Sequence, residues 1–295
     1  MFDQIFGNYL VHAGRISKEQ LAEVIEYEST VRVKLGLIAV AEKLITQEQA
    51  DEVNQLQAIM DKRFGDIAVE KGYLTEDQVG QLLKKQGNIY MLFVQTLIDK
   101  GFMTLEEIDE ALNAYQDEHG FTHSDMDDLV SGDIERTVRL FLPANTDIND
   151  RLCGIAVRTL LRVINSNAYV SKAYLVDELA ADNFAMQAME GDHSIISGFA
   201  GSGNSLLAIA EPFAEEKFEC VDLDALDAVG EFTNCINGLF ATDLSAEGVD
   251  IDMVPPEFYE NPVTLKGNQF CVFPIAMGED VVNFILSVDS DISIN

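Results

Sequence analysis

Residues 223–248 read LDALDAVGEFTNCINGLFATDLSAEG, and this stretch decides how we expect the second half of the chain to fold. At 100° per residue, its apolar side chains gather on one side of a helix: Ala225, Ala228, Val229, Phe232, Cys235, Ile236, Leu239 and Phe240. A polar stripe about 60° wide lies on the opposite side: Asp227, Glu231, Asn234 and Gly238. Because glycine inside a helix costs about 1 kcal/mol relative to alanine, we expect something to approach the helix closely at Gly238.

The segments around this helix predict a sheet. Residues 149–165 have the periodicity of an amphipathic helix, and short apolar runs predict strands at 168–176, 194–210, 249–254, 263–266, 269–277 and 280–288. Within 194–210, the sequence Gly201-Ser202-Gly203-Asn204 predicts a hairpin turn between two strands. We prefer this to a phosphate-binding loop because no helix signal follows at once and no lysine is adjacent. Residues 146–295 therefore predict an α+β domain with a largely antiparallel sheet.

The polar stripe also has the spacing of a known signature. The pattern Asp227-x-x-x-Glu231-x-x-Asn234-x-x-x-Gly238, with Pro255-Pro256 after the next strand, resembles that of the CheC/CheX chemotaxis phosphatases. The upstream segment SGFAGSGNSLLAIAEPFAEE resembles the corresponding part of CheX, and the resemblance covers about residues 146–290. CheC has two such helices, whereas the first helix here has no second Glu-x-x-Asn, so CheX is the closer relative.

This resemblance implies a reaction and a partner. The substrate would be the aspartyl phosphate of a CheY-like response regulator, with Glu231 contacting the regulator's lysine and Asn234 orienting the attacking water. Asp227 and Gly238 would complete the docking surface. A neutral amide suits this task, since it holds water without adding negative charge beside a phosphoryl group. The resemblance further implies a homodimer and no metal or cofactor of the chain's own, because the regulator brings Mg²⁺.

The first 120 residues contain a repeat. Four rows of 29 residues follow one another without a gap, at 5–33, 34–62, 63–91 and 92–120. Each row has a short apolar segment that ends at Gly14, Lys43, Gly72 or Gly101, and then a capping box that begins at Ser17, Thr46, Thr75 or Thr104. Each row therefore predicts a helix, a tight turn and a second helix, which makes residues 1–120 an all-α helical repeat domain.

Rows two and three resemble the tandem motif of the MshEN domain of type II secretion and pilus ATPases, some members of which bind cyclic di-GMP. The matching residues, which the resemblance implies as nucleotide ligands, are Lys34, Leu35, Gln57, Arg63, Phe64 and Gln86. The alternative is that they only pack and cap helices. Lys43 replaces the motif's glycine, and a non-glycine residue disfavours left-handed backbone, so we expect a shifted loop and no nucleotide binding.

Composition limits the remaining functions. The chain has 19 Lys+Arg against 51 Asp+Glu, a net charge of −32, which disfavours binding to nucleic acid polymers or to anionic membranes. No run is long and apolar enough for membrane insertion, and the start of the sequence does not resemble a signal peptide. The four cysteines are widely spaced, so we expect free thiols and a cytoplasmic protein. Residues 117–133 are polar and acidic and predict a connection with one helical turn, and we place the linker between the two domains at 121–145.

We therefore predict a phosphatase domain of the CheX type behind a helical repeat domain. Two other functions fit the same residues. The chain could be a catalytically silent signalling adaptor that docks regulators without hydrolysis. Alternatively, the repeats could do the main work as a nucleotide sensor or an assembly module.

Overall fold

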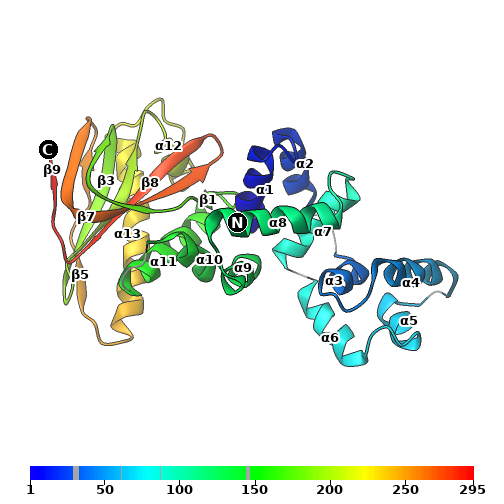
Figure 1. Ribbon diagram of the computed structural model, residues 1–295. Helices are drawn as coiled ribbons and strands as arrows, with labels where there is room; N and C mark the ends of the chain where they lie inside the picture. Colours follow the sequence, from blue (N-terminus) through cyan, green and yellow to red (C-terminus); the bar gives the residue numbers. More distant parts are fainter. Residues whose placement is uncertain (29–32, 61, 87, 144–146) are drawn as a thin grey trace. The chain divides into compact units, whose positions relative to one another are not determined.

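A computed structural model describes residues 1–295 apart from 29–32, 61, 87 and 144–146. Its helices and strands divide between two compact units, Phe2–Gly132 and Asp133–Asn295 (Figure 1). The first unit is helical and the second combines helices with one antiparallel sheet, so the chain is α+β as predicted. Residues 29–32 of row one, and 144 and 145 of the expected linker, lie outside the described residues.

Each row of the repeat forms two helices. They are α1 (Phe2–His12) and α2 (Lys18–Glu28), α3 (Leu35–Ala41) and α4 (Gln47–Met60), α5 (Phe64–Glu70) and α6 (Glu76–Lys85), and α7 (Ile89–Asp99) and α8 (Leu105–His119). All four predicted capping boxes are present. In row three, for example, the Thr75 backbone N–H donates to Gln78 Oε1 at 2.8 Å and the Gln78 N–H donates to Thr75 Oγ1 at 3.2 Å. The equivalent reciprocal bonds occur in the other three rows.

The expected linker contains two helices of eight residues each. α9 (His123–Val130) belongs to the first unit and begins with a fifth capping box, formed by Thr122 and Asp125. α10 (Ile134–Phe141) belongs to the second unit and begins at the side-chain cap of Asp133. The prediction of a single helical turn is therefore wrong. The acidic composition suggested a solvated linker, but local capping was enough to start both helices.

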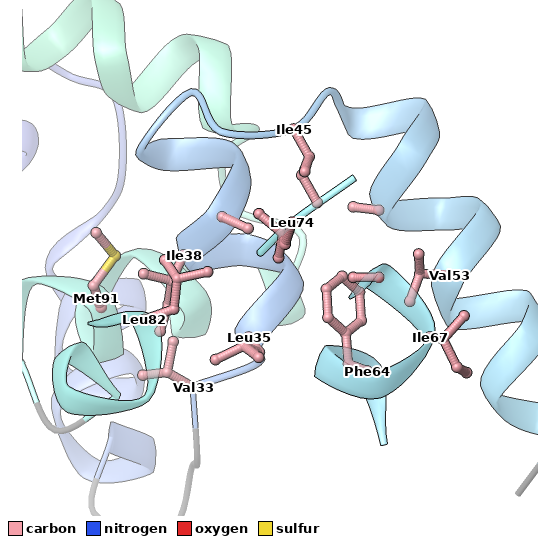
Figure 2. Close-up of a cluster of buried hydrophobic side chains, with 13 residues drawn as sticks. Val33, Leu35, Ile38, Ile45, Val53, Phe64, Ile67, Leu74, Leu82 and Met91 are labelled. Atoms are coloured by element: carbon pink, nitrogen blue, oxygen red, sulfur yellow. The ribbon is translucent and has the colours of Figure 1, made fainter. Parts of the chain in front are cut away.

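The rows pair in a nested order. Rows two and three share a core that includes Leu35, Ile38, Phe64, Ile67 and Leu74, which Figure 2 shows facing one another from α3, α5 and the segment after α5. α1 and α7 share an aromatic cluster instead, in which Phe2, Phe6 and Phe93 are buried. Phe2 stacks on Phe6, and Phe93 packs edge to face against both. Rows two and three therefore share one hydrophobic core, to which Val33 at the end of row one and Met91 of α7 also contribute.

The turn at Lys43 contradicts the expected shift. Lys43 has φ +55°, close to the +73° of Gly72 in row three. The Lys43 N–H donates to Val40 O at 2.9 Å, and the Gly72 N–H donates to Val69 O at the same distance. Hydrogen bonds that close the helix therefore hold a lysine in the left-handed conformation, and the turn keeps the geometry of its glycine counterpart.

In the second unit, helices cover one face of the sheet. They are α10, α11 (Asp147–Val163), α12 (Leu207–Ala214) and α13 (Leu223–Ser245). The strands are β1 (Tyr169–Val170), β2 (Tyr174–Ala181), β3 (Asn183–Gly191), β4 (Ile195–Gly201), β5 (Ile251–Met253), β6 (Glu257–Tyr259), β7 (Val263–Met277), β8 (Asp280–Val288) and β9 (Ile292–Ile294). Among the described residues, the central order is β1-β7-β8-β4-β3-β5, and β2, β6 and β9 pair with β7, β3 and β7 respectively. Figure 1 shows α13 lying behind the sheet.

Three strand predictions are wrong. Residues 168–176 do not form one strand, because β1 ends at Val170 and β2 begins at Tyr174. Residues 194–210 do not form a hairpin, because β4 ends at Gly201 and the helix α12 begins at Leu207 after a short turn. The helix lacks a side-chain cap at Leu206, so its start carried no capping signal in the sequence. Residues 263–266 and 269–277 form one continuous strand, β7, which pairs with β2 and β9 along its first half and with β8 along its second.

Lys43→Gly should raise the free energy of unfolding by up to about 1 kcal/mol. Left-handed backbone costs a non-glycine residue about 1–2 kcal/mol, and part of this gain is offset because glycine loses more conformational entropy on folding. The matched control is Gly72→Ala. Its new Cβ meets no atom within 4 Å, so only backbone strain acts, and it should destabilise by about 1 kcal/mol. Urea titration of the full chain, followed by helical circular dichroism, measures both. A lower free energy of unfolding for Lys43→Gly than for the wild type would show that the backbone at Lys43 is not strained.

Candidate functional site

α13 carries the whole predicted polar stripe. The helix begins at Asp222, whose side chain accepts a hydrogen bond from the Ala225 N–H at 2.9 Å. It ends at Ser245, and Gly248 lies just beyond in the left-handed region with φ +84°. The predicted start near Leu223 is confirmed. The helix stops three residues before the predicted end.

The buried face of α13 differs in part from the prediction. Cys235 and Leu239 are exposed, the latter by 44%, because they lie four and eight residues after Glu231 and so share its row along the helix. The buried face includes polar Thr233 and Asn237 instead, both with no exposed surface. The apolar pattern alone could not place these two residues inside.

The stripe residues differ in their surroundings. Asp227 and Glu231 are exposed, and neither forms an ion pair within the part of the chain that the structure describes. Asn234 and Gly238 are half-buried. The helix therefore presents two free carboxylates and, one turn further along, an amide that lies partly against the sheet.

The carboxamide of Asn234 is bonded to the sheet through Gln187. The Gln187 Nε2 donates to Asn234 Oδ1 at 2.8 Å and to the backbone oxygen of Val254 at 2.9 Å. Gln187 lies on β3 and is 1% exposed. This bond occupies one lone pair of Asn234 Oδ1, and the Asn234 Nδ2 donates to no group among the described residues. The amide thus keeps both donors and one acceptor site for another molecule.

The same hydrogen bonds continue into the core. Asn237 Nδ2 donates to Gln187 Oε1 at 2.9 Å, and Ser197 Oγ donates to Asn237 Oδ1 at 2.8 Å. Ser197 lies directly opposite Gln187 in the β3–β4 register, so both side chains leave the same face of the sheet, toward α13. The side-chain nitrogen and oxygen of Gln187 and of Asn237 therefore all have hydrogen-bond partners, as a low-dielectric interior requires.

The prolines after β5 pack close to α13. A Cβ added at Gly230 would overlap the ring of Phe258 and come within 3.2 Å of Pro256 Cβ, so only glycine allows this approach. At Gly238, by contrast, an added Cβ would meet only Met253 Cε, at 3.8 Å. Packing within the described chain therefore requires glycine at 230 but not at 238. No described part of the chain makes the predicted close approach at Gly238.

A shallow cavity of about 660 Å³ adjoins the two free carboxylates. It lies between the segment after α12 and the first turns of α13, and its lining includes Asp227 and Glu231. Further acidic residues in the lining are Glu216, Glu219, Asp222 and Asp224. Lys217, which also lines it, is ion-paired with Glu211. The surface around Glu231 is therefore strongly acidic and favours a cationic partner.

The loop between β4 and α12 is hydrogen-bonded to its own Ser205 and to Asp182 and Asn183 at the start of β3. The Gly203 N–H donates to Asp182 Oδ2 at 2.6 Å, and the Ser202 N–H donates to Ser205 Oγ at 3.1 Å. Asn183 Nδ2 donates to Gly203 O at 3.0 Å. The backbone donors that a phosphate would need are thus directed at protein oxygens, one of them a carboxylate.

In the helical unit, the six predicted nucleotide residues lie around one cavity of about 550 Å³. Its lining includes Lys34, Leu35, Gln57, Arg63, Phe64 and Gln86. Lys34 Nζ is paired with Asp99 at 2.8 Å, whereas Arg63 has no ion-pair partner among the described residues. The structure therefore brings both copies of the motif together, one contribution from each row.

Sequence reasoning missed Gln187, Asn237 and Ser197. Gln187 did carry a signal, since it interrupts the apolar residues Ala185 and Met189 on one face of a strand. Its partners Asn234 and Asn237 could not be read from the sequence because they depend on how α13 lies on β3, and the place of Ser197 depends on the β3–β4 register. Within the described residues, no group of acidic, histidine or cysteine side chains is arranged to hold a metal ion, and no helix combines the length and apolarity of a membrane span.

The β3–α13 segment has a known counterpart. Residues 184–276, which run from β3 into β7, match the family model described as chemotaxis phosphatase CheX. This match confirms the predicted resemblance to CheX for the segment that contains Gln187, Glu231 and Asn234. No curated protein matches the chain in sequence. The resemblance of the repeats to MshEN remains a prediction.

Solved structures of CheX proteins are similar to the second half of the chain. CheX from Desulfovibrio desulfuricans is 15% identical with a TM-score of 0.43, and the match covers 48% of this chain and 99% of that one. CheX from Vibrio vulnificus is 16% identical with a TM-score of 0.42, covering 48% and 99%. The match to the CheX–CheY–BeF₃–Mg²⁺ complex from Borrelia burgdorferi has 17% sequence identity and a TM-score of 0.37, and it covers 49% of this chain and 99% of that one.

The two glycines of α13 should respond oppositely to alanine. Gly238→Ala should stabilise the protein by about 1 kcal/mol, because the space is open and alanine is the better helix former. Gly230→Ala should destabilise it by about 1–3 kcal/mol, since the new methyl group overlaps Phe258. Urea unfolding of the full-length variants tests both. A Gly238→Ala protein as unstable as Gly230→Ala would show that internal packing does need that glycine.

Proposed function

We propose that the second unit removes the phosphoryl group from the aspartyl phosphate of a CheY-like response regulator. The observation that carries this proposal is the pair formed by Asn234 and Glu231. The amide of Asn234 is held in place by Gln187, and the carboxylate of Glu231 is exposed and unpaired on the same helix face. Both residues lie in the segment that matches chemotaxis phosphatase CheX.

The proposed reaction needs positioning more than covalent chemistry. Glu231 binds a lysine of the regulator, aided by the acidic surface around it, and so places Asn234 beside the phosphoryl group. Asn234 holds a water in line with the bond to the aspartate. The water oxygen attacks phosphorus, the bond to the aspartyl oxygen breaks, and phosphate and a free carboxylate result. The regulator supplies its own Mg²⁺, and the protein acts in the cytoplasm.

Asn234→Ala should abolish stimulated dephosphorylation and leave regulator binding within a few fold, because the amide acts on water rather than on docking. Glu231→Ala should weaken both, since it removes a charge from the docking contact. Phosphate release from ³²P-labelled regulator measures turnover, and calorimetry with the beryllofluoride-activated regulator measures binding. Activity should also fall as salt is added, because exposed charges are screened.

The matched control is Glu279→Ala, which removes an exposed carboxylate from the turn between β7 and β8. It should retain wild-type turnover. Full turnover by Asn234→Ala would exclude the water-positioning role, and a wild-type protein that binds regulators without releasing phosphate would favour the silent adaptor.

A second candidate function is cyclic di-GMP binding by the repeats. Two observations favour it over the expectation of no binding: the six predicted residues line one cavity, and the turn at Lys43 keeps the glycine-like geometry. In this proposal Arg63 and Lys34 attract the phosphates. Leu35 and Phe64 offer apolar contact to the bases, and Gln57 and Gln86 offer amide oxygens.

Arg63→Ala should weaken cyclic di-GMP binding by about 10- to 100-fold, because charge-assisted hydrogen bonds contribute about 1.5–3 kcal/mol. Titration calorimetry on the full chain measures it. Lys18→Ala, which removes an exposed cation that does not line the cavity, should bind as the wild type does. No heat from the wild type at about 100 μM ligand would leave the repeats as a docking or assembly scaffold.

A further inference from the structure

The carboxamide of Asn234 is oriented by a buried chain of hydrogen bonds whose direction one backbone atom determines. Val254 O can only accept a hydrogen bond, so the side chain of Gln187 must turn its Nε2 toward it. The two N–H groups of this Nε2 are then used by Val254 O and by Asn234. Asn234 must therefore present Oδ1, since its Nδ2 would place a donor against a donor.

The opposite end of Gln187 obeys the same rule. Its Oε1 accepts from Asn237 Nδ2, which leaves Asn237 Oδ1 to accept from the Ser197 hydroxyl. A flip of Gln187 would set like atoms against each other at three contacts. A flip of Asn237 would set its Oδ1 against Gln187 Oε1, although the Ser197 hydroxyl could accept as well as donate. The chain from Ser197 to Asn234 therefore has one consistent arrangement.

Val254 is itself held from both sides. Its N–H donates to Ala188 O at 2.9 Å, next to Gln187 on β3. Pro255 follows it, and a residue before proline is confined to extended backbone. The carbonyl of Val254 is thus fixed in direction before any partner arrives. Pro255 therefore influences the orientation of the Asn234 amide through the Val254 carbonyl, although it carries no reactive group.

We propose that Gln187 is a positioning residue for the reaction, acting through Asn234 under the direction of the Val254 carbonyl. The inference rests on the proposed function. Gln187 is 1% exposed and touches no substrate. Its role is to hold the amide plane of Asn234 so that Nδ2 and the remaining lone pair of Oδ1 face outward, where a water and a phosphoryl oxygen can meet them without reorganisation.

The test compares Gln187→Met with Gln187→Glu. Methionine keeps the length and volume but removes both donors, so Asn234 is free to rotate. Glutamate keeps the shape but places acceptors against Val254 O and Asn234 Oδ1, which favours a flipped amide. For the phosphorylated regulator, each should lower kcat by about 10- to 100-fold and leave KM within about twofold, as expected when water positioning is lost and docking is not.

Two comparisons separate positioning from a loss of core stability. Because Asn234→Ala should leave no stimulated turnover, its double variant with Gln187→Met is compared by binding. It should bind the beryllofluoride-activated regulator as tightly as Asn234→Ala alone, since Gln187 acts only through the missing amide. Thr233→Val removes a buried hydroxyl beside Asn234 whose bond goes only to Val229 O, and it should keep wild-type kcat. Weaker binding by the double variant, or a loss of kcat with Thr233→Val equal to that with Gln187→Met, would overturn the positioning role.

A third measurement does not depend on activity. In the wild type, both side-chain N–H protons of Gln187 should exchange slowly with solvent in NMR spectra, and the Asn234 side-chain signals should shift in Gln187→Met. Slow exchange in a protein that releases no phosphate would overturn the proposed function while the hydrogen-bond chain stands. If the wild type releases phosphate and Gln187→Met has a normal kcat, the positioning role is overturned while the proposed function stands.

Discussion

The close packing of α13 on β3 is the constraint on which the candidate site depends. Position 230 has no side chain, which lets the helix lie close to Pro256 and Phe258 at β6, and the buried amide of Asn237 meets Gln187 on β3. A buried amide without partners is costly, so this contact tolerates little change in the height or rotation of the helix. Since Asn234 lies less than one turn from Asn237, the core fixes where the exposed stripe points.

Much of this arrangement could be predicted from local sequence. The start of α13 and its polar stripe follow from helical periodicity, and the four capping boxes follow from hydroxyl and amide residues three positions apart. These features depend on neighbours within one or two turns. Asn237 and Gln187 could not be paired in this way, because 50 residues separate them and their contact depends on how α13 lies on β3.

The two mispredicted regions show the limits of such signals. α12 starts without a side-chain cap after a glycine-rich segment, so its sequence looks like a hairpin turn. Lys43 looks like a broken motif, yet the hydrogen bonds of the turn hold it at φ +55°. In the first case, the helix start lacks a capping signal in the sequence. In the second, local hydrogen bonds of the turn outweigh the conformational preference of lysine.

The nested pairing of the four rows has a consequence for the order of folding. The chain enters the inner pair at Val33 and Lys34, which are hydrogen-bonded to Gln86 and Gln95 at its exit. Contacts of the outer pair, such as that of Phe6 with Phe93, join residues far apart in sequence and must close a long loop. Once the inner pair has formed, that loop is short. Rows two and three should therefore act as the nucleus on which rows one and four assemble.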